Sequence, residues 1–163
     1  MDMDLAQWLV GFRALHGRAK QGPLAGLDAE AYLAGREELA RALTAAQGVA
    51  VPPGQSPRQA LRVARALQVE LESPVRKERI TTFDLSLAGF SALMAGAPAP
   101  DEELSATLRL PGTDPVQARV TVADVKRQPG NSRVVFRFRT LGDKDRDRLE
   151  LAVFDAVLSQ LSA

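Results

Sequence analysis

The sequence contains no cysteine and only one histidine, His16. The absence of cysteine excludes disulfide bonds, thiolate metal sites and cysteine nucleophiles. A single histidine argues against a Ser-His-Asp site and against a multi-histidine zinc site. We therefore expect a protein that is not an enzyme and that needs neither a metal nor a cofactor for its function.

Excess charge and long apolar runs are also missing. Lys and Arg total 21 and Asp and Glu total 20, a net charge of +1, which argues against a partner that is a nucleic-acid polymer. No stretch is long and apolar enough to span a bilayer, and the acidic start Met1–Asp4 differs from a basic secretory signal. Asp2 stands where N-myristoylation requires glycine. We expect a cytoplasmic protein without membrane insertion.

Residues 1–48 show the spacing of an α-helical hairpin. Apolar residues recur on one helical stripe at Leu5, Trp8, Leu9, Phe12 and Leu15. Gly22-Pro23 interrupts the stripe, and Asp28 is the expected N-cap of a second helix that stops at Gly48. We place His16 on the helix surface. Because two such helices cannot bury both apolar faces alone, we expect them to contact the rest of the chain or a partner.

Residues 49–62 are expected to form a Pro/Gly-rich basic linker. Pro52, Pro53, Gly54 and Pro57 argue against helix and central strand alike. The arginines of this region, Arg58, Arg62 and Arg65, all precede the next acidic residue, Glu70. The linker would thus be a basic arm in front of the following domain.

From residue 63 the apolar period changes to two, and residues 63–163 are expected to form one β domain. The expected strands cover 63–71, 79–84, 90–94, 104–110, 116–125 and 133–140, with a hairpin turn at Arg76–Arg79. In the last strand, Arg133, Arg137 and Arg139 share a face that we interpret as solvated rather than as a nucleic-acid stripe. A helix capped by Asp143 ends the chain. Short strands without intervening helices indicate a small antiparallel barrel or sandwich.

Two short motifs flank the first expected strand. Arg58 and Arg62 form an R-x-x-x-R pattern at the end of the linker, and Asp84, Ser86 and Gly89 form a D-x-S-x-x-G pattern at a strand break. Each motif is weak alone, with a solvated linker and a Ser turn as the ordinary explanations. Their order and their separation, with a strand between them, are more specific.

This pair of motifs resembles the PilZ domain family of cyclic-di-GMP receptors. The resemblance runs from Arg58 to the C-terminus and leaves the hairpin outside. It implies a mainly β fold, a six-stranded antiparallel β-barrel with a C-terminal α-helix. It also implies that the ligand cyclic-di-GMP binds at five residues, with Arg65 as a possible addition: Arg58, Arg62, Asp84, Ser86 and Gly89.

The chemistry of these residues suits such a ligand. A guanidinium can pair with phosphate oxygens or with guanine O6 and N7. Asp84 can accept from the N1–H and N2–H₂ groups of guanine, or hold an arginine, and Ser86 offers a hydroxyl and an amide. Gly89 permits a sharp turn and a close approach of ligand to backbone. Many relatives that bind a ligand dimer carry an arginine where this chain has Pro57, so we expect one ligand per domain.

The functional hypothesis is a receptor whose arm closes over the ligand and thereby rearranges the N-terminal helices. Those helices would then meet a downstream protein or a second copy of the chain. The alternative is a ligand-independent PilZ-like adaptor for pilus, flagellar or secretion machinery. A nucleic-acid-binding small barrel is a third, weaker alternative. The resemblance suggests regulation of bacterial motility or biofilm formation without deciding the pathway.

Overall fold

The computed structural model describes residues 4–51 and 53–161. Its contacts divide the chain into two compact units. The N-terminal unit holds the described residues up to Leu61 together with residues 157–161, and the barrel unit runs from Arg62 to Ala156. Each unit is considered by itself.

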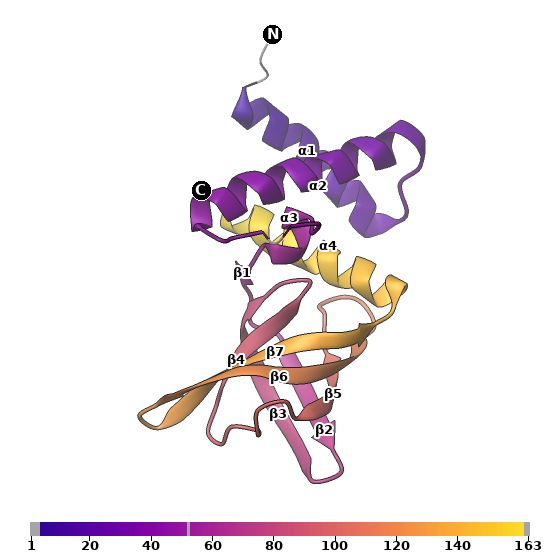
Figure 1. Ribbon diagram of the computed structural model, residues 1–163. Helices are drawn as coiled ribbons and strands as arrows, with labels where there is room; N and C mark the ends of the chain where they lie inside the picture. Colours follow the sequence, from indigo (N-terminus) through magenta and orange to yellow (C-terminus); the bar gives the residue numbers. More distant parts are fainter. Residues whose placement is uncertain (1–3, 52, 162–163) are drawn as a thin grey trace. The chain divides into compact units, whose positions relative to one another are not determined.

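The N-terminal unit is built on a helical hairpin of α1 (Leu5–Gln21) and α2 (Gly26–Gln47), as predicted (Figure 1). Gly48, with φ of 70°, ends α2 in the left-handed conformation that glycine adopts without strain. Phe12 of α1 stacks on Tyr32 of α2 with ring centroids 5.4 Å apart. A Cβ on Gly35 would lie 2.7 Å from the Phe12 ring, so this glycine lets the aromatic ring approach α2.

Two predictions for the hairpin are wrong. Asp28 is not an N-cap, because α2 begins at Gly26 and Asp28 lies in its first turn, where its carboxylate accepts from Arg18 at 2.7 Å. His16 is not a surface residue: it is 4% exposed, and its Nδ1 lies 2.6 Å from the Tyr32 hydroxyl. The buried stripe of α1 passes through Phe12 and His16, while Leu5 is exposed.

The predicted linker contains a short helix, α3 (Pro57–Ala60), so the expectation that Pro57 excludes helix is wrong. Proline is tolerated at the first helical position because the N–H there has no intrahelical acceptor. Ser56 caps the helix by accepting from the Arg58 N–H at 3.1 Å, and its hydroxyl donates to Glu37 at 2.6 Å. These bonds connect α3 to α2.

The barrel unit is a closed six-stranded antiparallel β-barrel, as predicted (Figure 1). Its order is β3-β2-β5-β6-β7-β4, and β4 pairs with β3 to close the ring. The strands are β2 (Gln68–Ser73), β3 (Arg76–Leu85), β4 (Gly89–Met94), β5 (Glu103–Leu108), β6 (Val116–Gln128) and β7 (Asn131–Leu141). The two-residue β1 (Val63–Ala64) pairs with the end of β3.

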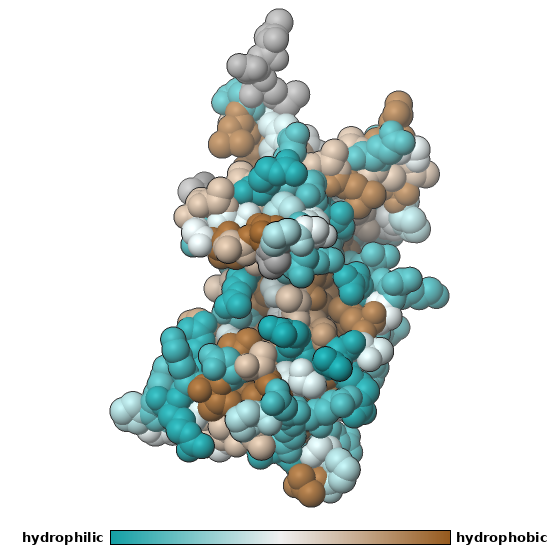
Figure 2. All heavy atoms as spheres, in the orientation of Figure 1, coloured by the Kyte–Doolittle hydropathy of each residue, from teal (hydrophilic) through white to brown (hydrophobic). Residues whose placement is uncertain are grey.

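Alternation of apolar and polar residues gives the barrel its core. Side chains with almost no exposed area include Val69, Leu71, Leu85, Phe90, Leu104, Leu108, Val116, Val120 and Phe136. In Figure 2 the visible face of the barrel carries hydrophilic residues over most of its area, with smaller apolar patches among them. The separation of buried apolar side chains from exposed polar ones follows the period of two along each strand.

The strand expected over 63–71 is interrupted between β1 and β2. The buried Thr82 hydroxyl accepts from the Leu67 N–H at 2.8 Å and donates to the Arg65 carbonyl, so it replaces ladder bonds at the break. The turn expected at Arg76–Arg79 is also misplaced, because the chain turns at residues 74–75 and this cluster begins β3.

The final helix, α4 (Asp143–Gln160), starts one residue earlier than expected, with Asp143 inside its first turn instead of capping it. Arg148 donates to the Asp114 carbonyl at 2.6 Å, which attaches the helix to the β5–β6 connection. Leu149, Val153 and Phe154 are fully buried. Among the described residues no helix has the length and apolar character to cross a membrane.

Candidate functional site

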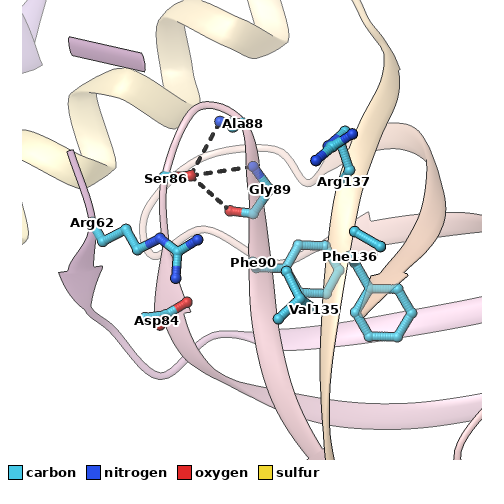
Figure 3. Close-up of a pocket in the computed structure, with 10 residues that line it drawn as sticks. Arg62, Asp84, Ser86, Ala88, Gly89, Phe90, Val135, Phe136 and Arg137 are labelled. Atoms are coloured by element: carbon cyan, nitrogen blue, oxygen red, sulfur yellow. Dashed lines mark hydrogen bonds between the residues drawn. The ribbon is translucent and has the colours of Figure 1, made fainter. Parts of the chain in front are cut away.

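The D-x-S-x-x-G motif forms the connection between β3 and β4. The Ser86 hydroxyl accepts from the backbone N–H groups of Ala88 and Gly89 at 3.1 and 3.3 Å (Figure 3). The Ser86 N–H donates to the Gly89 carbonyl at 2.9 Å. Ser86 is buried, so its first role is to hold this tight turn.

Gly89 is required by the neighbouring strand. It pairs with Arg137 of β7, and a Cβ on it would lie 1.9 Å from the Phe136 carbonyl oxygen. No other residue type fits without moving one of the two backbones. The close approach of β7 is thus a further reason for Gly89, beside the turn and the approaching ligand expected from the sequence.

Asp84 is held from two sides near the end of β3. Its Oδ1 accepts from the Ser91 hydroxyl at 2.8 Å, and its Oδ2 accepts from the Arg133 guanidinium at 3.2 Å. Arg133 also lies over the Phe83 ring, 4.8 Å from its centroid. The interpretation of Arg133 as part of a purely solvated face is therefore wrong.

A hollow on the barrel unit gathers most of the predicted site residues. Figure 3 shows the Arg62 guanidinium directed toward Asp84, with the Ser86–Gly89 turn above them and Arg137 on the other side of that turn. The hollow has a volume of about 90 Å³. It is lined by Arg62, Asp84, Ser86, Ala88, Gly89, Phe90, Ala123, Val135, Phe136 and Arg137.

The other two arginines lie elsewhere. Arg58 is the second residue of α3 and belongs to the N-terminal unit. Arg65 lies at the break between β1 and β2 and does not line the hollow. The division between the two units falls after Leu61, so the two arginines of the R-x-x-x-R motif belong to different units.

Arg137 is a member of the site that was not predicted from the sequence. Period-two alternation places Arg133, Val135 and Arg137 on one face of β7. Only the register, with Gly89 opposite Arg137 and Ser91 opposite Val135, brings that face beside the motif. Strand register over long sequence separations was the missing information.

The hollow combines cationic, anionic and apolar groups. Arg62 and Arg137 suit phosphate oxygens, Asp84 suits N–H donors, and Val135 offers apolar contact to a flat base. Ligand pockets usually enclose about 300–1,000 Å³. This smaller hollow can take only part of a dinucleotide, so a ligand of that size needs further contacts outside it. In the described part of the chain no group of His, Asp and Glu side chains could hold a metal ion.

Comparison with models of known protein families shows to which family the chain belongs. The family model of the PilZ domain matches residues 56–155, which covers both motifs and all six barrel strands. The chain belongs to the PilZ domain family. PilZ domains are binding domains, not enzymes, in agreement with the sequence analysis. A search of curated protein sequences gave no significant match to the chain.

Solved structures share the fold at low sequence identity. The Bacillus subtilis inhibitor of motility MotI/DgrA matches with a TM-score of 0.57 and 19% identity, over 67% of this chain and 57% of that one. Escherichia coli YcgR in complex with c-di-GMP matches with a TM-score of 0.54 and 14% identity, over 61% and 46%. MrkH of K. pneumonia matches with a TM-score of 0.54 and 15% identity, over 68% of this chain and 52% of that one. This chain thus matches about half the length of each.

Proposed function

We propose that this PilZ protein is a cyclic-di-GMP receptor that binds the dinucleotide at the hollow beside the D-x-S-x-x-G turn. The observation that carries the proposal is the meeting of Arg62, Asp84, Ser86 and Gly89 around one hollow, although 21 residues separate Arg62 from Asp84. Family membership supports it, as do fold relatives solved with c-di-GMP.

In this proposal the guanidinium groups of Arg62 and Arg137 contact phosphate or guanine acceptors, and Asp84 accepts from a guanine edge. Arg58 supplies a contact outside the hollow, and Arg65 can add another. A ligand held by both Arg58 and Arg62 would restrain the short segment that connects them. Pro57 occupies the place of an additional arginine, so we expect one ligand per chain.

The proposed signal is a rearrangement of the N-terminal helices when the arm engages the ligand. A downstream protein, or a second copy of the chain, would then meet those helices in the cytoplasm. The support is the exposed apolar surface of the hairpin, where Val10 of α1 and Leu27 of α2 are 67% and 82% exposed. The same exposure favours the second candidate function, a ligand-independent adaptor.

Calorimetric titration with cyclic-di-GMP tests the proposal. The wild-type chain should bind with a stoichiometry near one, and Arg62→Ala should weaken binding at least tenfold, because a charge-assisted hydrogen bond contributes about 1.5–3 kcal/mol. Arg139→Ala removes an exposed arginine of β7 that does not line the hollow and should bind normally. GTP should give no heat. A wild-type chain with neither heat nor thermal stabilisation at high ligand would leave the adaptor as the function.

A further inference from the structure

We propose that Arg133 is a positioning residue, which orients the Asp84 carboxylate for guanine without touching the ligand. The inference rests on the proposed function, because it assumes that Asp84 accepts hydrogen bonds from the dinucleotide. It assigns a role to a strand residue that lies 49 positions after Asp84 and outside both motifs.

The two contacts to Asp84 fall on different oxygens. Ser91 donates to Oδ1 at 2.8 Å and Arg133 donates to Oδ2 at 3.2 Å, so the carboxylate cannot rotate without losing one of them. Each carboxylate oxygen has a second lone pair. The pair of oxygens can therefore still accept two parallel donors, which is the pattern of guanine N1–H and N2–H₂. The 17% exposure of the Asp84 side chain leaves room for such an approach.

Arg133 is itself held in place. Its guanidinium carbon lies over the Phe83 ring at 4.8 Å, a favourable cation–π arrangement, and its side chain is 35% exposed. Phe83 and Asp84 come from β3, Ser91 from β4 and Arg133 from β7. Three adjacent strands of the closed barrel thus fix one carboxylate, and the ring beneath Arg133 keeps its planar donor group near Oδ2.

Arg133 differs from the other arginines of the site in its relation to the hollow. Arg62 and Arg137 line it, whereas Arg133 does not. Because its guanidinium is engaged by Asp84 and by the Phe83 ring, we expect its effect on the ligand to pass through Asp84. This expectation can be tested, because two residues that act through one contact give non-additive losses.

The experiment is a double-mutant cycle measured by calorimetry with cyclic-di-GMP on the full chain. Arg133→Ala should weaken binding about tenfold, a change of 1.4 kcal/mol. In an Asp84→Asn background, the same substitution should cost less than twofold. Arg133→Lys should recover part of the affinity, and the exposed Arg139→Ala should bind as the wild type. Residual binding of cyclic-di-AMP, which lacks the N1–H and N2–H₂ donors, should not respond to Arg133→Ala.

Additive losses in the cycle would overturn the inference, because they would mean that Arg133 contacts the ligand directly. Unchanged affinity of Arg133→Ala, beside a wild type that binds, would overturn it and leave the receptor proposal intact. A wild type that does not bind would refute the receptor proposal itself. If Arg133→Ala does not fold, Ser91→Ala replaces it as the test variant. This substitution removes the other hydrogen bond to Asp84 and should also weaken binding. An unchanged affinity of Ser91→Ala would count against positioning of the carboxylate.

Discussion

Single residues of the D-x-S-x-x-G motif serve the barrel and the site together. The Ser86 hydroxyl accepts hydrogen bonds within the turn between β3 and β4, and Gly89 allows β7 to approach β4. The same turn forms one side of the hollow (Figure 3). Substitutions in the motif should therefore affect stability as well as binding, and only a stability measurement on each variant separates the two effects.

Gly89→Ala should destabilise the barrel by about 3 kcal/mol, because a Cβ placed 1.9 Å from the Phe136 carbonyl oxygen forces two backbones apart. The free energy of unfolding in urea measures the loss. Gly96→Ala is the matched control, since nothing lies within 4 Å of its Cβ position, and it should change stability by less than about 0.5 kcal/mol. Equal stabilities for the two variants would contradict the close approach of β4 and β7.

Most of the candidate site residues could be predicted from the two sequence motifs. The two motifs and their resemblance to the PilZ family predicted Arg58, Arg62, Asp84, Ser86 and Gly89, and the structure brings all of these except Arg58 to one hollow. The partners of Asp84 were not predictable. Arg133 and Ser91 reach the carboxylate through strand register, and register over 49 positions leaves no periodic trace in the sequence.

At the scale of elements, the break between β1 and β2 depends on one buried hydroxyl. Thr82→Val keeps the shape of the side chain but removes the acceptor for the Leu67 N–H and the donor to the Arg65 carbonyl. We expect a loss of about 1–3 kcal/mol, since buried polar groups would be left unsatisfied. Chemical denaturation of the variant measures this loss.

The neighbouring exposed residue gives the control for this variant. Thr81 lies on the outer side of the same strand, so Thr81→Val should change stability by less than about 0.5 kcal/mol. Thr82→Val should in addition weaken cyclic-di-GMP binding, because β1 follows directly after Arg62. Comparable stabilities for both variants would show that the hydroxyl does not hold the break.

Two exposed ion pairs connect strands around the barrel and should contribute to its pH dependence. The hydrogen bond from Arg109, together with its charge, lowers the pKa of Glu70 below 4.5, and Arg119 lowers the pKa of Glu103 in the same way. A carboxyl whose pKa is lowered by folding stabilises the folded state at pH values above the pKa that it has in the unfolded chain. That contribution is lost as the pH falls below about 4.5 through the folded pKa.

The double variant Arg109→Gln/Arg119→Gln should therefore lose less stability than the wild type between pH 6 and pH 3. Urea denaturation at several pH values gives the two curves. Because both pairs are exposed, the difference should shrink in high salt. Parallel curves at low salt would mean that these pairs do not stabilise the fold.

Element types were largely predictable, and element boundaries were less so. Period-two alternation marks the barrel strands because each has one face in the core, and the helical stripe of residues 5–15 marks α1. The break at 65–67 and the short helix at Pro57 depend on particular hydrogen bonds of Thr82 and Ser56. Such bonds with partners chosen by the tertiary fold override local propensity.

At the scale of the whole molecule, the first motif lies across a division of the chain. Arg58 belongs to the N-terminal unit and Arg62 to the barrel unit. A ligand that contacts both would restrain the connecting segment. We expect amides of residues 53–62 to exchange more slowly with solvent when cyclic-di-GMP is bound, as followed by hydrogen–deuterium exchange with mass spectrometry.

The control for that experiment is Arg58→Ala, which leaves the barrel hollow intact. It should retain ligand-induced protection at residues 86–89 and lose it at 53–62. Equal exchange of residues 53–62 with and without ligand in the wild type would refute the ordering of the arm, though not binding at the barrel.

An NMR titration of the ¹⁵N-labelled chain with cyclic-di-GMP shows whether the ligand occupies the hollow lined by Arg62, Asp84 and Gly89. We expect saturable shifts of the backbone amides at Arg62, at residues 84–91 and at residues 133–137. Amides on the far strands β2 and β5 should stay nearly unchanged. An absence of shifts at saturating ligand, or shifts centred away from the β3–β4 turn, would contradict the binding of cyclic-di-GMP at this hollow.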